Sequence, residues 1–317
     1  MSAVAPARSA GAGRGDLVAS DLTRRRRPGE AVVVTVLRVC AGLSVVVTVG
    51  IVVSLLGPAL DFFRQVPVVE FLTGTVWRPN FQPQQYGVLP LVGGTLMTTV
   101  IGLLVAVPFG LGSAMYLSEY AGRRTRARLK PVLELLAGVP SVVYGFFALQ
   151  FVTPVLLQDW LGLEVGFTNV LAAGLVLGVM VIPTVASLSE DAMHAVPDAL
   201  RQGSFAMGAN RMQTTLRVVF PAAISGIAAA IVLGLSRAIG ETMIVALAAG
   251  SVPNLSLDPR EGMQTMTGYV AQTAGGENIV GSLSYDTLFA VGLLLFGMTL
   301  VVNLVSISLV RRFRQEY

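Results

Sequence analysis

The sequence predicts an all-α polytopic membrane protein with six transmembrane helices, and three observations support this. Of its 317 residues, 54% are hydrophobic and only 13% are charged, with a mean hydropathy of +0.72. Soluble domains carry about 25% charged residues, so the composition excludes an ordinary soluble enzyme. Six apolar runs each approach the ~20 residues that cross a bilayer. Lys and Arg residues gather in alternate loops, as the positive-inside rule requires.

The N-terminal segment, residues 1–30, lacks any apolar period. It is rich in Ala, Gly, Ser and Arg and ends close to four consecutive arginines, Arg24 to Arg27. This composition predicts a disordered cytoplasmic tail. A secretory signal is the competing interpretation, but the following apolar run is too long for its hydrophobic region and shows no convincing cleavage pattern.

The six apolar runs predict one transmembrane domain over residues 31–317. Gly174 and Gly178 lie in the fourth run, where small residues four apart allow two helices to pack closely. Arg38 lies near the inner end of the first run, where its side chain can reach the interface. The predicted spans are about 32–56, 88–116, 132–156, 168–188, 218–249 and 288–310.

The distribution of positive charge predicts the orientation. Seventeen of the 22 Lys and Arg residues lie in the two tails and in the loops after the second and fourth spans. The opposite loops hold Arg64, Arg78 and Arg260 together with most of the loop carboxylates, and Arg38 and Arg237 lie within spans. Both termini are therefore expected in the cytoplasm of a bacterial cell, with the acidic loops outside the plasma membrane. No nucleic-acid partner is implied by this charge.

A polar stretch between the fourth and fifth spans is too long for a turn and too polar to cross a membrane. Its apolar residues are spaced for an amphipathic helix, expected over about 197–213, on the cytoplasmic side. A surface helix of this kind can dock into a groove of a soluble partner. The alternative is an interfacial helix that has no partner.

The fifth span contains two charged residues, Arg237 and Glu241. They are four apart, so in a continuous helix they share a face and can pair. Arg237 is sixteen residues beyond Pro221, about 24 Å along a helix, which places it near or past the membrane midplane. A guanidinium there suits a phosphate-like oxyanion in a translocation pathway. A structural ion pair between helices is the alternative.

The sequence offers little for catalysis or metal binding. The only lysine, Lys130, precedes Pro131, so no Gly-x4-Gly-Lys-Ser/Thr phosphate-binding loop is present, and ATP with its Mg²⁺ is expected on a separate ATPase. The single cysteine, Cys40, excludes an intrachain disulfide. His194 is the only histidine, and a solvated or capping role suits it better than a metal site. We expect no cofactor bound by this chain.

The polar stretch resembles the signature loop of ABC importer permeases, written Glu-Ala-Ala-x3-Gly-x9-Ile-x-Leu-Pro. Gln202-Gly203-Ser204 stands in place of the first triplet, Gly208 follows at the same spacing, and Val218-x-Phe220-Pro221 closes the pattern. The resemblance implies a type I ABC importer permease core of the MetI-like fold. It also implies that this loop docks on the ATPase, and Arg201, Gln202, Gly203, Ser204, Gly208 and Pro221 are the expected coupling residues.

Other segments resemble the PstC-type phosphate permease, over about residues 32–314. They are Thr73 to Trp77, Gly94 to Thr99, Leu117 to Ala121, Ala137 to Gly145 and Ser236 to Met243. The resemblance implies that Arg237 and Glu241 take part in phosphate passage. It also implies a second permease (PstA-like), ATPase subunits (PstB-like), an external phosphate-binding protein (PstS-like) and membrane lipid as partners.

Three other functions stay open. A permease for sulfate, molybdate or another oxyanion would share the coupling loop, and only the resemblance favours phosphate. A membrane scaffold or sensor of phosphate status would share it as well. A membrane enzyme is the least favoured, because no nucleophile–base pair or metal cluster supports it.

Overall fold

The computed structural model describes residues 28–276, 279 and 281–313. The predicted tail therefore lies outside the described residues, apart from positions 28–30. The chain divides into two compact units, residues 1–51 and 52–317. In the first unit, the described residues form the first part of the long helix α1 (Pro28–Gln65). The rest of α1 and all later elements belong to the second unit.

Among the described residues, six helices are long and apolar enough to cross a membrane, which confirms the predicted fold class. Their bounds differ from the predicted ones by up to about ten residues, because hydropathy alone does not mark where a helix begins. They are Ala31–Gln65, Leu89–Tyr120, Ser141–Trp160, Val170–His194, Arg211–Ile239 and Leu283–Ser308.

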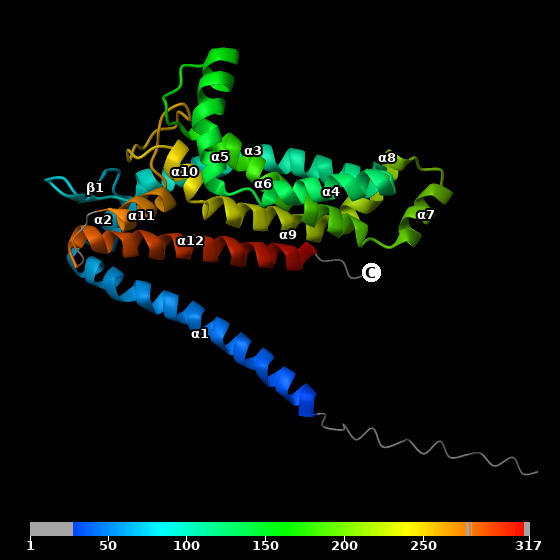
Figure 1. The fold of residues 1–317 in the computed structure, drawn as a ribbon, viewed down its shortest axis with the longest axis horizontal. Helices are drawn as coiled ribbons and strands as arrows, with labels where there is room; N and C mark the ends of the chain where they lie inside the picture. The colour runs from blue at the N-terminus through cyan, green and yellow to red at the C-terminus, as the bar shows by residue number, and fades with distance from the viewer. Residues whose placement is uncertain (1–27, 277–278, 280, 314–317) are drawn as a thin grey trace, which may run out of the picture. The chain divides into compact units, whose positions relative to one another are not determined.

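Four long helices form the body of the second unit. They pack in the order α3, α6, α9 and α12, and Figure 1 shows them running side by side. They comprise α3 (Leu89–Met115), α6 (Val170–His194), α9 (Phe220–Ile239) and α12 (Leu283–Phe313).

The α3–α6 contact depends on the glycines singled out in the fourth span. A Cβ atom placed on Gly174 would lie 2.7 Å from Cβ of Ile101, and one on Gly178 would lie 2.6 Å from Cβ of Val105. Both distances are far below van der Waals contact. The two glycines therefore allow the helices to approach as closely as they do.

The third span begins later than predicted. Residues 132–137 belong to α4 (Arg123–Ala137), a charged amphipathic helix without buried residues. The span itself consists of α5 (Ser141–Phe147) and the wider π-helix η2 (Ala148–Trp160), which leave the layer of α3, α6 and α9 in Figure 1. The apolar half of α4 merges with α5 in a hydropathy profile, which explains the early boundary.

The end predicted to be external is organised around aromatic side chains. A short helix α2 (Val68–Thr73) leads into the antiparallel strands β1 (Trp77–Arg78) and β2 (Gln85–Tyr86), and α11 (Met266–Gly275) packs nearby. Trp77 is 2% exposed, and its ring meets that of Tyr269 edge-on at 5.1 Å. The aromatic contacts make this end a packed core rather than loose loops.

At the opposite end, the predicted coupling helix (197–213) is two helices. They are α7 (Asp198–Ala206) and α8 (Arg211–Thr214), separated by a turn at Gly208. The short π-helices η1 (Tyr116–Tyr120) and η3 (Thr215–Val219) end α3 and join α8 to α9.

The predicted fifth span (218–249) is also interrupted. Helix α9 stops at Ile239, and α10 (Met243–Ala248) begins after three residues outside any helix.

Candidate functional site

The interruption of the fifth span places Arg237 and Glu241 at a helix break. Glu241 Oε1 accepts hydrogen bonds from the backbone N–H groups of Met243 at 3.1 Å and Ile244 at 3.4 Å. These are first-turn donors of α10, which have no partner within the helix. The backbone carbonyl of Glu241 accepts from Thr267 Oγ1 on α11 at 2.7 Å. Glu241 therefore caps α10 and joins it to α11.

Arg237 lies in the last turn of α9 and is exposed. Its Nη1 atom lies 3.5 Å from Thr184 Oγ1 on α6, a long hydrogen bond. No ion pair joins Arg237 to Glu241, although the structure describes both residues. The expected pairing is absent because the chain leaves the helix between them and the α10 amides engage the carboxylate.

Within the described part of the chain, this arrangement leaves the guanidinium of Arg237 without a charged partner in an apolar span. Arg237 near the C-terminal end of α9 and Glu241 at the N-terminus of α10 each complement the local helix dipole. An Arg within a span costs about 2.5–3.5 kcal/mol on insertion scales, so exposed Arg237 needs water, an anion or another protein chain beside it. Its planar donors fit the oxygens of an oxyanion.

The coupling segment contains a well-defined turn at Gly208. Gly208 has φ +85°, which disfavours residues with a Cβ atom. Its N–H donates to the carbonyl of Phe205 at 2.9 Å, and the N–H of Ala209 donates to that of Ser204 at 3.2 Å. This pair of bonds is the Schellman helix ending, and it gives the glycine of the signature loop a local structural reason.

Side-chain hydrogen bonds stabilise the turn on both sides. Ser204 Oγ and Thr214 Oγ1 are 2.9 Å apart and link α7 to α8. Asn210 and Gln213 form a capping box at the start of α8. Pro221, which cannot donate a backbone hydrogen bond, follows the π-turn η3 at the start of α9, where a wider turn accommodates its missing N–H.

Arg201 does not extend outward with the other coupling residues. Its guanidinium donates to Glu119 at the end of α3, at 3.1 and 3.3 Å, and to the carbonyl of Met193 on α6 at 2.8 Å. The Arg201 and Glu119 side chains are only 14% and 8% exposed. Arg201 therefore holds α7 against the inner ends of α3 and α6. Glu119 thus pairs with a residue 82 positions away rather than with the adjacent basic loop.

The outward surface of the coupling segment is apolar. Met207 is 88% exposed and Met212 is 62% exposed, with Phe205 and Leu216 also exposed beside them. Gln202 and Gly203 are exposed too, whereas Leu200 packs against the core. Flexible methionines on an exposed surface are suited to a groove on another protein.

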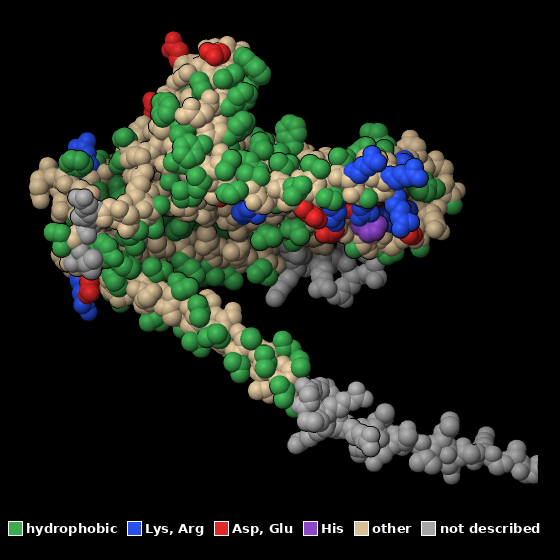
Figure 2. Space-filling view, in the orientation of Figure 1, with side chains coloured by type: hydrophobic (Ala, Val, Ile, Leu, Met, Phe, Trp, Pro, Cys, Tyr) green, Lys and Arg blue, Asp and Glu red, His purple; other side chains and the backbone are tan. Residues whose placement is uncertain are grey.

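A second ion-pair cluster joins α4 to α6. Glu190 is completely buried and pairs with Arg126 and with Lys130, whose Nζ lies 2.8 Å from Glu190 Oε2. Lys130 also bonds Asp191, and hydrogen bonds to Asp191 and then Glu190 raise the pKa of the Lys130 amine. Figure 2 shows Lys and Arg side chains gathered at this end of the second unit, around α4 and α7.

The described residues thus hold two assemblies, a helix break with Arg237 and Glu241, and a coupling segment with the other predicted residues. Sequence reasoning missed Thr184, Thr267, Glu119 and Glu190 as partners. Glu119 carried a weak signal, as the first charged residue after the apolar run 88–116. The three other residues lie far along the chain from their partners, so no local sequence pattern could reveal these contacts.

Comparisons with known proteins agree on one family. The family described as "Binding-protein-dependent transport system inner membrane component" matches residues 106–316. The probable ABC transporter permease protein YqgH of Bacillus subtilis is 37% identical over 86% of each chain. The phosphate transport system permease protein PstC 1 of Mycobacterium tuberculosis is 34% identical over 77% of this chain and 82% of its own. An inward-facing structure of the MetNI methionine ABC transporter matches with a TM-score of 0.54 and 20% identity, over 72% of this chain and 95% of that one.

Proposed function

Because the chain belongs to the family of binding-protein-dependent transport system inner membrane components, we propose that it forms half of the pathway of an ATP-driven phosphate importer. It is a multi-pass protein of the bacterial inner membrane. The relatives named PstC support phosphate as the cargo. The observation that carries the proposal is Arg237, an exposed guanidinium beside a break in an apolar span, with no charged partner among the residues that the structure describes.

Arg237 and Glu241 have different roles in the passage of an anion. Arg237 binds an oxyanion through charge and through directed N–H donors. Glu241 is four residues further along the chain, and its negative charge opposes the tight binding that would prevent release. Discontinuous helices are a common way to build such a site, since the break exposes backbone and side-chain dipoles at membrane depth.

A separate ATPase supplies the energy. The sequence contains no Gly-x4-Gly-Lys-Ser/Thr loop, since Lys130 is the only lysine and Pro131 follows it. The exposed apolar surface around Met207 and Met212 is the proposed contact with the ATPase. Positive charge concentrated at the same end supports a cytoplasmic position for that contact.

Three kinds of partner complete the importer. A PstA-like permease forms the other half of the pathway, PstB-like ATPases bind the coupling segments, and a PstS-like protein delivers the anion from outside. ATP binding closes the ATPases, and α7 carries their motion through Arg201 to the ends of α3 and α6. The core then alternates between outward and inward access.

Uptake by the purified complex in vesicles tests the cargo and the residue together. Phosphate should accumulate with ATP and the binding protein, whereas sulfate at the same concentration should not. Arg237→Gln should abolish phosphate uptake while the complex still assembles, as shown by copurification. Arg217→Gln, an exposed arginine of η3, is the matched control and should retain uptake.

The opposite results identify the alternatives. Preferred uptake of sulfate or molybdate would make the chain a permease for another oxyanion. Normal phosphate uptake by Arg237→Gln would remove Arg237 from the pathway. A wild-type complex that reports phosphate status without moving phosphate would be a sensor or scaffold instead.

A further inference from the structure

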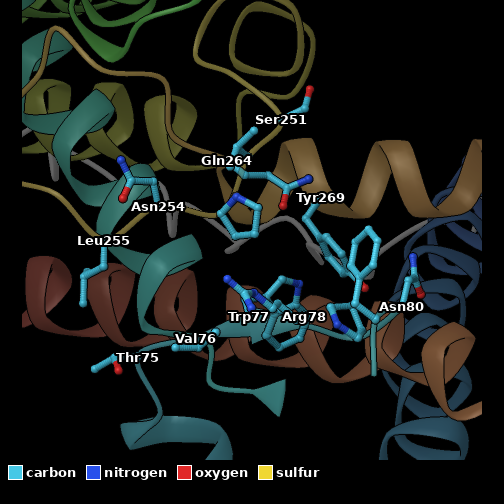
Figure 3. Close-up of a pocket in the computed structure, with 14 residues that line it drawn as sticks. Thr75, Val76, Trp77, Arg78, Asn80, Ser251, Asn254, Leu255, Gln264 and Tyr269 are labelled. Carbon is cyan, nitrogen blue, oxygen red and sulfur yellow. The ribbon is translucent and has the colours of Figure 1, made fainter. Parts of the chain in front are cut away.

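A cavity of about 640 Å³ opens at the end predicted to be external. The turn after β1 forms one wall, and the loop that follows α10 forms the other. Figure 3 shows Trp77, Arg78, Gln264 and Tyr269 around this cavity. It is separate in sequence from Arg237 and from the coupling segment, so neither assembly accounts for it.

At the end predicted to be external, Arg78 is the arginine that the described ion pairs leave free to bind an anion. Of the three arginines predicted outside, Arg64 pairs with Asp61 at 2.7 Å and Arg260 pairs with Asp258 at 2.6 Å. Hydrogen bonds from Arg260 lower the pKa of Asp258 to about 2, so this carboxylate stays ionised well into the acidic range. Arg78 is exposed and has no ion-pair partner within the described part of the chain.

The rest of the lining also favours an anion. Among the residues that the structure describes, no Asp or Glu side chain lines the cavity. Trp77 contributes a ring to the wall, and its indole Nε1 is buried away from the open space beside Tyr269. Ser251 Oγ accepts from Gln272 Nε2 at 2.8 Å, which leaves the hydroxyl hydrogen of Ser251 free to donate. A lining with donors and one guanidinium, but without carboxylates, is suited to an oxyanion.

The frame around these donors is rigid. Trp77 contacts Tyr269 edge-on and pairs with Tyr86 across β1 and β2. Ser284 Oγ at the start of α12 donates to the carbonyl of Pro79 at 2.9 Å and fixes the turn after β1. Packed neighbours of this kind hold a binding site in place before the ligand arrives.

The cavity and the helix break share one segment. Gln264 lines the cavity, and the next residue, Thr265, caps α11 by accepting from the N–H of Gly268 at 3.1 Å. Thr267, two residues later, donates to the carbonyl of Glu241 in the break. Residues 264–267, three of which are polar, therefore connect the wall of the outer cavity to the helix break.

We propose that this cavity is an outer waiting site, where a hydrated phosphate ion binds to Arg78 before it passes to Arg237. The proposal rests on the proposed function. The cavity is too large for a bare phosphate ion but accommodates one with a first hydration shell, since a dozen waters at ~30 Å³ each occupy about 360 Å³. Binding of a hydrated ion is weak and salt-sensitive, as a transit site requires.

Direct binding of inorganic phosphate tests the site. We would measure it by equilibrium dialysis of the whole complex in lipid nanodiscs, without the external binding protein and in the Arg237→Gln background. The binding that remains should weaken at least tenfold on Arg78→Gln and severalfold on Ser251→Ala, which removes the hydroxyl donor. Arg64→Gln, the matched control, should change it less than twofold.

Uptake distinguishes failure of this site from failure of the function. With Arg237 intact, Arg78→Gln should reduce phosphate uptake severalfold. Equal binding by the Arg78→Gln and Arg64→Gln variants, or no residual binding in the Arg237→Gln background, would overturn the waiting site while wild-type uptake still supports the importer. A variant that binds phosphate normally but loses capture of the external binding protein would make the cavity a protein contact. A wild-type complex that moves no phosphate would refute the proposed function itself.

Discussion

Glu241 shows how one side chain can serve two purposes at a helix break. Its carboxylate accepts from two backbone donors of α10, and its charge lies four residues from Arg237. The sequence singled out both residues as charges inside a span, whereas the structure places Arg237 in the last turn of α9 and Glu241 in the break beyond it. The sequence did not show the cap, because the spacing of four assumed a continuous helix.

Replacing Glu241 separates the cap from the charge. In Glu241→Gln the amide oxygen can still accept from the α10 donors, so we expect assembly and thermal stability to stay close to wild type. Phosphate should bind more tightly and leave more slowly, which lowers the maximal uptake rate and the half-saturating concentration together. Uptake kinetics in vesicles measure both quantities.

Glu241→Ala is the matched variant, since it loses both functions. It should show the same slower release and also a loss of about 1 kcal/mol in stability, the usual cost of removing a helix cap. If Glu241→Gln lowers the stability as much as Glu241→Ala does, the carboxylate charge rather than the cap holds α10 in place.

At the scale of elements, hydropathy located the six spans but not their interruptions. The break at Gly240 to Thr242 is too short to lower the average over a window of about 20 residues, so the fifth span was read as one helix. The apolar half of α4 was assigned to the third span for the same reason, because a hydropathy window does not resolve the short segment between α4 and α5. At Gly208 the glycine was noticed through its motif spacing, whereas the turn that it makes depends on backbone bonds to Ser204 and Phe205.

The turn at Gly208 predicts a graded response to substitution. A Cβ atom there would meet nothing within 4 Å, so only the positive φ opposes a side chain. We expect Gly208→Val to cost at least about 1–2 kcal/mol of conformational free energy and to reorient α8 relative to α7. Gly208→Asn should be tolerated, because Asn adopts this conformation more readily.

Copurification of the ATPase and its stimulation by the binding protein measure the effect. Gly208→Val should lose most of the stimulation, and Gly208→Asn should retain it. Gly112→Ala is the control, since Gly112 is helical in α3, outside the coupling segment, and also has open space around it, and Ala favours helix by up to ~1 kcal/mol. Stimulation that survives Gly208→Val would show that the turn geometry is unimportant for coupling.

At the scale of the molecule, ion pairs with buried carboxylates join distant segments of the second unit. Glu119 and Arg201 are 82 positions apart, and Lys130 and Glu190 are 60 apart. No local pattern reveals such pairs, so the sequence predicted the charges but not their partners. They join α7 to α3 and α4 to α6, at the end where the ATPase is proposed to bind.

The Arg201 contacts predict an uncoupled importer when they are removed. Arg201→Gln leaves Glu119 buried without its counter-charge, a change that typically costs 3–5 kcal/mol for a fully buried pair and about half of that or less for one with some access to water. We expect the coupling segment to stay bound to the ATPase through Met207 and Met212. Movement of α7 should then displace α3 and α6 less than in the wild type. ATP hydrolysed per phosphate imported should therefore rise severalfold in vesicles, while the ATPase still copurifies.

Two further variants decide whether Arg201 acts inside the permease or on the ATPase. Glu119→Gln combined with Arg201→Gln removes both charges, so the double variant should be closer to wild type in stability than Arg201→Gln alone. Arg211→Gln on α8 is the control, because Arg211 is exposed and has no ion-pair partner among the described residues. If Arg201→Gln instead releases the ATPase and the double variant releases it equally, Arg201 contacts the partner, because a direct contact does not depend on Glu119.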